Sequence, residues 1–290
     1  SCKKDQQDFT KNMKIIECPR DAMQGIKEFI PTKKKIDYIN QLLSVGFDTI
    51  DFGSFVSPTA IPQLKDTAEV LKGLDLTNTS SKLLSIIANL RGAIDACNFE
   101  EINYLGFPLS VSEEFQKRNT NKSITEALKT VEEIHDLALK NNKELVVYIS
   151  MAFGNPYGEN YHPDIVAELT EKLHKLGVGI IAFSDTIGVS DPLNITPLFS
   201  TLISEYPTIE FGAHFHTTPD KWEEKIDAAY KNGCKRFDAT IKGYGGCPMA
   251  NNKLIGNIPT EKLITYFTED LELNKQELYK ALTLTSSISN

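Results

Sequence analysis

The residues with the clearest potential for chemistry are two histidines in the stretch FGAHFHTT, residues 211–218. His214 and His216 are two of only five histidines in the chain, and they stand one residue apart. On a β-strand, side chains two positions apart point to the same face. Two neutral imidazoles and a carboxylate from another segment form a common ligand set for a divalent cation. The pattern favours a metal site, although two buried, hydrogen-bonded histidines remain an alternative.

Three further residues could complete such a site. Asp21 follows the apolar run 13–18 and is the best candidate for the carboxylate. Arg20 beside it could form a surface ion pair, but its place between an apolar strand and a loop favours a role at the site. Cys247 follows three glycines in GYGGCPMA. It is interpreted either as a thiol on a mobile lid or as a small apolar residue under a loop.

The elements that must position these residues alternate in type. Short apolar runs, rich in β-branched residues, are separated by stretches of helical period, several of which end in glycine. The runs cover residues 13–18, 48–54, 82–88, 101–107, 144–152, 179–185, 210–216 and 236–243. This repetition is typical of parallel βαβ units. Eight units predict a single (β/α)8 TIM barrel of the α/β class, with a brief helix at 89–98 and extra C-terminal helices after residue 258.

Polar residues follow nearly every predicted strand. In a (β/α)8 barrel the active site lies at the C-terminal ends of the strands. The polar residues at these ends are Arg20, Asp21, Gln24, Asp51, Ser54, Asn89, Asp185, Thr186, His214, His216, Lys242 and Cys247. The sequence therefore predicts that they gather at one mouth of the barrel.

Composition narrows the class of protein. Of the 290 residues, 41% are hydrophobic and 24% charged, as in ordinary globular domains, so residues 13–290 are predicted to form one catalytic domain after a flexible N-terminus at 1–12. The net charge of −8 argues against a broad nucleic-acid or membrane-binding face. No apolar run is long enough for a membrane span. Five scattered cysteines favour a reducing, cytoplasmic setting, although Cys2 as a processed lipoprotein start remains an alternative.

Several motifs together resemble a known family. They are ECPRDAMQ, DFGSFVSP, SDTIGVSDP, HFHTT, GGCP and GNIPTEKL, in this order along residues 13–270. The pattern resembles the 3-hydroxy-3-methylglutaryl-CoA (HMG-CoA) lyase family, whose members are metal-dependent barrel enzymes that make or break carbon–carbon bonds through an enolate. The RD-x-x-Q and H-x-H elements are shared with condensing relatives such as isopropylmalate synthases. The sequence has no GxGxxG or P-loop motif for nucleotide binding, no CxxC motif for zinc or iron–sulfur clusters and no GxSxG motif of hydrolases.

The resemblance implies a role for each matching residue. A divalent metal ion, Mg²⁺ or Mn²⁺, would be held by Asp21, His214, His216 and Asn257. Catalytic roles would fall on Arg20, Cys247, Asp51 and His214, with Asp51 standing where the lyase has a glutamate. Substrate-binding roles would fall on Gln24, Ser54, Asp185 and Thr186. Arg20 would stabilise negative charge on the thioester oxygen, and Cys247 would be the family's loop cysteine.

The implied reaction is a metal-assisted retro-Claisen cleavage of HMG-CoA to acetoacetate and acetyl-CoA. The alternatives are an acyl-CoA condensing synthase, a metal-dependent hydroxy-oxo-acid aldolase, and a barrel that binds metal or acyl-CoA without catalysis. The chain departs from the family pattern at Ala22, Met151, Asn155, Ser184 and Thr217. Thr217 replaces the usual aspartate after H-x-H, which could weaken the orientation of the histidines. The expected partner is a small acyl-CoA, and the resemblance makes a homodimer plausible.

Overall fold

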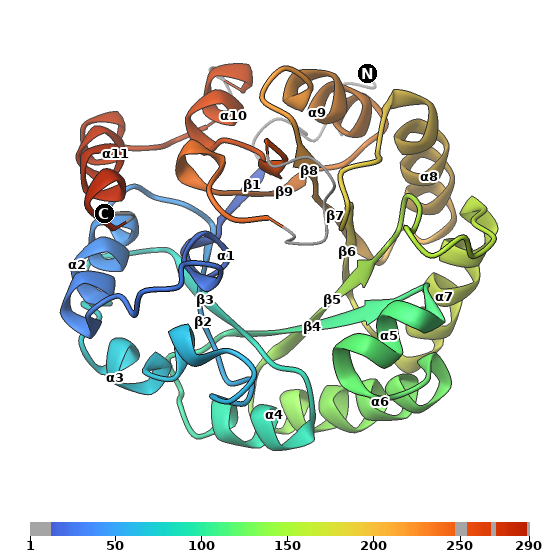
Figure 1. Ribbon diagram of the computed structural model, residues 1–290, viewed down its shortest axis with the longest axis horizontal. Helices are drawn as coiled ribbons and strands as arrows, with labels where there is room; N and C mark the ends of the chain where they lie inside the picture. The colour runs from blue at the N-terminus through green and yellow to red at the C-terminus, as the bar shows by residue number, and fades with distance from the viewer. Residues whose placement is uncertain (1–12, 247–253, 268–270, 289–290) are drawn as a thin grey trace, which may run out of the picture.

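The strands form one closed parallel barrel. The computed structural model describes residues 13–246, 254–267 and 271–288. Its barrel strands, in spatial order, are β1 (Lys14–Glu17), β2 (Thr49–Ser54), β3 (Lys82–Ile86), β4 (Tyr104–Ser110), β5 (Glu144–Ser150), β6 (Ile180–Ser184), β7 (Glu210–His214) and β9 (Arg236–Ala239), with β9 returning to β1 (Figure 1). Each strand overlaps one predicted apolar run, although β4 begins and ends three residues later than the predicted run 101–107. The predicted (β/α)8 barrel is therefore confirmed.

Helices surround the barrel. They are α1 (Pro19–Gln24), α2 (Thr32–Leu43), α3 (Thr67–Lys72), α4 (Leu90–Cys97), α5 (Glu113–Thr120), α6 (Ile124–Lys140), α7 (Pro163–Leu176), α8 (Pro192–Glu205), α9 (Trp222–Lys231), α10 (Thr260–Tyr266) and α11 (Lys275–Ile288), with short 3₁₀ turns η2 (Pro62–Leu64) and η3 (Ile241–Gly243). Figure 1 shows α1 inside the ring of outer helices, next to the barrel. The chain thus places α1, and Arg20 and Asp21 on it, at the barrel mouth.

Local chemistry explains where the helices begin and end. The Ser123 hydroxyl accepts from the backbone N–H of Glu126, whose carboxylate accepts in turn from the backbone of Ser123, which completes a capping box at the start of α6. Gly177 ends α7 with a φ of 91°, a left-handed conformation that favours glycine. These stops return the chain to the barrel after each helix.

Two apolar clusters hold the barrel together. The larger one lies between the strands and the outer helices, where outward-facing residues such as Ile181 and Phe183 pack. The smaller one consists of inward-facing residues, namely Leu84, Tyr104, Val146, Tyr148, Ile180 and Ala182. Along β5 and β6, alternating side chains supply the two clusters in turn. A filled barrel interior leaves the C-terminal mouth as the place for a binding cavity.

One predicted strand ends earlier than expected. The prediction of a single strand through residue 216 is wrong at its end, because β7 stops at His214. His216 lies in β8 (His216–Thr217), which pairs antiparallel with β10 (Gly256–Asn257). The chain leaves the barrel after His214 because the next backbone groups pair with β10 instead of β9. This small second sheet places Asn257 directly opposite His216.

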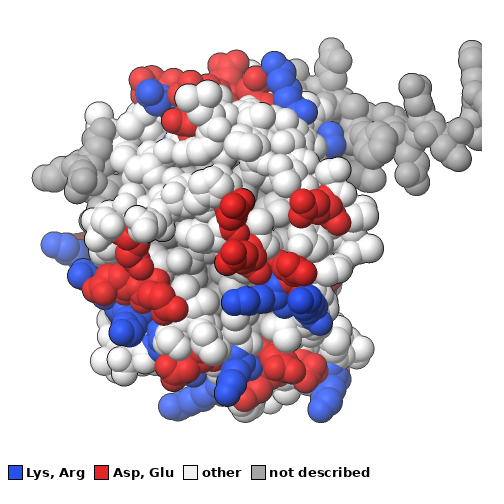
Figure 2. Space-filling view, turned by 90° about the vertical axis from the view of Figure 1, so that its right-hand side faces the viewer, with Lys and Arg blue, Asp and Glu red and all other residues white. Residues whose placement is uncertain are grey.

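The molecular surface carries charges of both signs. On the face shown in Figure 2, acidic and basic side chains are interspersed and form no extended basic patch. Within the described ranges, no helix is both long and apolar enough to cross a membrane. The expected flexible N-terminus at 1–12 lies outside the described residues.

Candidate active site

Three predicted metal ligands meet at the barrel mouth. Asp21 comes from α1, His214 from the end of β7 and His216 from β8. One potential ligand atom of each lies within 4.8 Å of those of the other two. The Nε2 atom of His214 is 3.2 Å from Oδ2 of Asp21, and the two imidazole centroids are 5.4 Å apart. Residues nearly 200 positions apart in sequence therefore converge on one point.

His216 shows why this group suits a cation. Its Nδ1 atom donates to the carbonyl of Thr186 at 2.9 Å, so the lone pair of the ring lies on Nε2. Nε2 is buried and has no hydrogen-bond partner among the described residues. A buried acceptor without a partner costs free energy, which a metal ion would recover. The two imidazoles and one carboxylate therefore fit a divalent cation.

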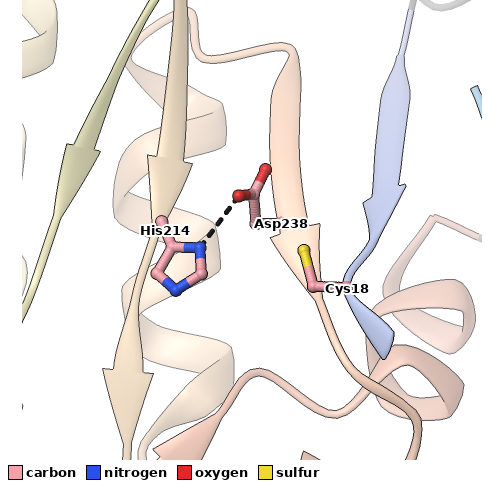
Figure 3. A group of neighbouring side chains, drawn as sticks. All are labelled: Cys18, His214 and Asp238. Carbon is pink, nitrogen blue, oxygen red and sulfur yellow. Dashed lines mark hydrogen bonds and ion pairs between the residues drawn. The ribbon is translucent and has the colours of Figure 1, made fainter. Parts of the chain in front are cut away.

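A second carboxylate holds His214 from the other side. Oδ2 of Asp238, on β9, lies 2.8 Å from Nδ1 of His214, and Figure 3 shows the two side chains pointing toward each other. A carboxylate on the far nitrogen of a metal-binding histidine fixes its tautomer and its ring orientation. Sequence reasoning missed Asp238. The sequence could have indicated it in one way. Asp238 follows the apolar Phe237 on a predicted barrel strand, so its side chain should point to the opposite face, into the barrel.

The charges of this group are strongly coupled. Burial by itself lowers the pKa of His214, yet hydrogen bonds to Asp21 and Asp238 raise it to about 10. Burial raises the pKa of Asp21, but the hydrogen bond from His214 and the charge of Arg20 bring it below its usual range. Burial and the charge of His214 lower the pKa of His216. A proton therefore sits between Asp21 and His214, at the position that a cation would take.

Arg20 is fixed by two neighbours. Its Nη2 and Nε atoms donate to the Asp51 carboxylate at 2.9 and 3.1 Å, and Nη1 donates to Oε1 of Gln24 at 2.6 Å. These contacts use three of the five N–H groups of the guanidinium, so two remain for a ligand. Burial raises the pKa of Asp51 to about 6 even with Arg20 beside it. Asp51 and Gln24 thus hold the guanidinium of Arg20 in a fixed orientation.

The site opens into a cavity of about 430 Å³. Both polar and apolar side chains line it. The lining comprises Arg20, Asp21, Gln24, Val56, Ala60, Ile61, Ile86, Ala88, Pro108, Asn119, Tyr148, Ser150, Ser184, Thr186, His214 and His216. A small polar molecule with an apolar substituent would suit this lining.

The other predicted site residues lie at different depths. Ser54 is buried, and its hydroxyl accepts from the backbone of Val56. Asp185 is buried outside the cavity lining, where it accepts from Ser190 and forms an ion pair with Lys225. Thr186 lines the cavity and accepts from His216 through its carbonyl.

The last two predicted residues are Asn257 and Cys247. Asn257 lies opposite His216 and donates to the Tyr244 carbonyl at 3.0 Å, which fixes its amide. Cys247 lies outside the described residues.

The glycines before Cys247 reach the metal-ligand group. Gly245 has a φ of 91°, and a Cβ atom there would lie 2.6 Å from the Asp21 carbonyl oxygen. Gly246 donates its backbone N–H to Oδ1 of Asp21 at 3.5 Å. Only a residue without a side chain allows the chain to pass this close to Asp21. The start of the glycine loop is thus part of the site.

Sequence comparisons agree with this geometry. A family model described as HMGL-like matches residues 12–287. The chain is 32% identical over 266 residues to hydroxymethylglutaryl-CoA lyase YngG of Bacillus subtilis, covering 91% of this chain and 88% of that protein. It is 35% identical over 260 residues to the mitochondrial hydroxymethylglutaryl-CoA lyase of Bos taurus, covering 88% and 78% respectively.

Solved structures point to the same group. The HMG-CoA lyase of Bacillus subtilis superposes with a TM-score of 0.89 at 31% identity, covering 96% of this chain and 93% of the other. An HMG-CoA lyase from Acinetobacter baumannii, in complex with coenzyme A and 3-methylmalate, superposes with a TM-score of 0.86 at 31% identity, covering 96% and 92%. The family model, which matches residues 12–287, spans every segment that forms the site described above.

Proposed function

This chain belongs to the HMGL-like family, and from that premise we propose that it is a carbon–carbon lyase that cleaves HMG-CoA to acetoacetate and acetyl-CoA. The observation that carries the proposal is the group of Asp21, His214 and His216 beside the fixed guanidinium of Arg20 in one cavity. The lyases at 32% and 35% identity, which match most of the chain, support the reaction and its direction.

The cofactor is a divalent cation, Mg²⁺ or Mn²⁺, held by Asp21, His214 and His216. Asn257 is the proposed fourth ligand, because β10 places it opposite His216. When bound, such an ion would lower the pKa of the substrate hydroxyl and orient the bond that breaks. Asp238 keeps the His214 ring in place, and the Thr186 carbonyl does the same for His216. His216 thus presents its free Nε2 before the ion arrives, and His214 would do so once the ion displaces the proton that it shares with Asp21.

Arg20 supplies fixed positive charge. As the carbon–carbon bond breaks, negative charge moves onto the oxygen of the thioester enolate. The two N–H groups of Arg20 that Asp51 and Gln24 leave free can stabilise that oxygen. A donor held in position in this way contributes roughly 3–4 kcal/mol in comparable oxyanion sites. Because Asp51 and Gln24 already orient the guanidinium, it needs little reorganisation as the charge develops.

Two proton transfers complete the reaction. The substrate hydroxyl loses a proton, and the enolate carbon of the product gains one. Cys247 remains our proposed donor for the second transfer, although it lies outside the described residues. The contact of Gly245 and Gly246 with Asp21 supports this role, because it anchors the start of the cysteine loop at the site.

We further propose that the substrate enters as a coenzyme A thioester and that the protein acts in the cytoplasm, with a homodimer as the expected assembly. The Acinetobacter baumannii structure, which contains coenzyme A, supports the first part. The free thiols of Cys18, Cys97 and Cys234 are consistent with a reducing compartment. The face shown in Figure 2 carries no extended basic patch of the kind that binds nucleic acids.

The test is an assay of purified protein with Mg²⁺ and HMG-CoA, with the free hydroxy acid and a free hydroxy-oxo acid run in parallel. We expect acetoacetate and acetyl-CoA in equal amounts from the thioester only, and loss of both products in a His216→Ala control. Turnover of the free hydroxy-oxo acid would instead favour an aldolase. Condensation of acetyl-CoA with an oxo acid, without cleavage of HMG-CoA, would favour a synthase.

A further inference from the structure

A second group of potential metal ligands lies directly behind the first. Cys18 precedes α1 at the end of β1, and Asp238 lies on the neighbouring strand β9. Figure 3 shows both side chains beside His214, on the side of the ring that carries Nδ1. Potential ligand atoms of Cys18, His214 and Asp238 lie within 4.8 Å of one another. The two groups share His214 but use opposite ring nitrogens.

The donor atoms of this second group suit a soft cation. Cys18 is 1% exposed, and its thiol contacts the carbonyl oxygen of Ile16 at 3.5 Å. Oδ1 of Asp238 is buried and has no hydrogen-bond partner among the described residues. Sulfur, imidazole nitrogen and carboxylate oxygen are ligands of tetrahedral Zn²⁺, in which neighbouring sulfur and nitrogen ligands lie roughly 3.6 Å apart. Small side-chain shifts from the observed arrangement would reach that spacing.

Charge also favours such an ion. A thiolate and a carboxylate together carry two negative charges, which neutralise one divalent cation in this buried position. The O and N donors of Asp21, His214 and His216 accept Mg²⁺ or Mn²⁺, whereas a thiolate selects softer ions such as Zn²⁺ and Cd²⁺. The two groups therefore differ in the metals that they prefer.

We propose that Cys18, His214 and Asp238 form a second site for a soft divalent cation, and that occupancy of this site excludes the catalytic metal. A neutral imidazole has one lone pair and one N–H. In the first site Nε2 of His214 binds the ion and Nδ1–H donates to Asp238; in the second, Nδ1 binds the ion and Nε2–H faces Asp21. Binding at the second site releases to solvent one proton from the Cys18 thiol and one from Nδ1. The exclusion rests on the proposed role of His214 in the first site.

A soft cation bound at the second site would affect catalysis. Soft cations would inhibit the enzyme by reversing the tautomer of a catalytic metal ligand, and high concentrations of Mg²⁺ would relieve the inhibition. Cys18 does not line the cavity and takes no part in the proposed reaction. Cys18→Ala should therefore keep its Mg²⁺-dependent activity while losing the second site.

The experiment titrates the full-length protein with Cd²⁺ and follows the ultraviolet absorption of cadmium bound to thiolate, with and without excess Mg²⁺. We expect the wild-type protein to bind one equivalent of Cd²⁺ that Mg²⁺ displaces. In Cys18→Ala the affinity for that equivalent should fall by at least roughly tenfold. The matched control is Cys97→Ala, in which the half-buried thiol of α4 is removed and the band should remain.

Three outcomes would overturn the proposal. If Cys18→Ala keeps the magnesium-sensitive band, another thiol binds the ion. If Cys97→Ala loses it as well, the band reports general damage. If the band depends on Cys18 but Mg²⁺ does not displace it, the two sites do not exclude each other. Calorimetry with Mg²⁺ alone separates these results from a failure of the proposed function, because it reports the first site directly.

Discussion

The two sides of the barrel mouth differ in how far the protein itself satisfies their hydrogen-bonding groups. On the arginine side, formed by Arg20, Gln24 and Asp51, the protein's own groups satisfy most of the hydrogen bonds of the guanidinium. On the histidine side, formed by His214 and His216, Nε2 of His216 is buried without a partner among the described residues. The guanidinium is thus held in place before any ligand binds, whereas a buried ring nitrogen on the histidine side lacks a partner. The difference separates two tasks, because a preset charge serves the transition state and an open ligand set serves the metal.

The largest expected effect comes from removing a ligand on the histidine side. His216→Ala should weaken Mg²⁺ or Mn²⁺ binding by more than the roughly 100-fold seen for outer-shell partners, because it deletes a direct donor. Asp21→Ala should have a similar effect. Isothermal titration calorimetry of each variant measures this. Binding that matches the wild-type protein would remove these residues from the ligand set.

Removing the arginine should affect turnover and leave metal binding nearly unchanged. Arg20→Met should cut turnover by at least ~100-fold while metal affinity stays nearly intact. The fold should survive, because Asp51, whose pKa is already about 6, can take up a proton when its partner is lost. Steady-state kinetics and calorimetry on the same sample provide the check. Turnover at the wild-type rate would show that Arg20 has no part in the chemistry.

A smaller effect on the histidine side tests how the rings are oriented. Asp238→Asn replaces a charged acceptor of His214 with an amide of nearly the same shape. Metal affinity should fall by about tenfold, with a fall in activity at low metal that high metal concentrations restore. A variant that binds metal as tightly as the wild-type protein would mean that Asp238 does not position His214.

The mildest test concerns a buried carboxyl group away from the cavity. Glu17 accepts hydrogen bonds from the backbone N–H of Ile241 and the hydroxyl of Thr260. Burial nevertheless raises its pKa from 4.5 to about 8. A raised pKa means that the folded state binds the proton more tightly than the unfolded state does. Stability from this group is therefore full below about pH 4.5 and is lost as the pH rises through 8.

Glu17→Gln keeps an acceptor at this position and removes the titration. As the pH rises from 5 to 8, the wild-type protein should lose stability that the variant keeps, so the free energy of unfolding of the variant should increase relative to that of the wild-type protein. Urea denaturation at several pH values measures this difference. Activity with saturating metal should change little, because Glu17 does not line the cavity. Parallel stability curves for the two proteins would place the pKa of Glu17 near its ordinary value instead.

Much of the fold could be predicted because its signals are local. Each barrel strand is a short apolar run, and a helix with its own cap or glycine stop follows many of them, as with Ser123 and Gly177. His214 and His216 could be singled out because histidine is rare in this chain and the two are close in sequence. The structure brings both together with Asp21, as the strand order implies.

What could not be predicted depends on contacts between distant segments. The end of β7 at His214 is set by the pairing of His216 with Asn257, which no local pattern reveals. Asp238 contacts a histidine 24 positions earlier across neighbouring strands, so in the sequence it resembles any polar residue on a strand. The burial of Asp185 with Lys225 was hidden for the same reason. Contacts of this kind follow from register and closure of the barrel.

The most direct test of the account is a crystal structure of the protein with Mn²⁺, using anomalous scattering to locate the ion. We expect one strong peak bonded to a carboxylate oxygen of Asp21 and to Nε2 of both His214 and His216, at about 2.0–2.5 Å. We also expect Arg20 to remain bound to Asp51 and outside the coordination sphere. A peak elsewhere, or one that lacks either histidine, would contradict the assignment of the metal site and the reaction proposed from it.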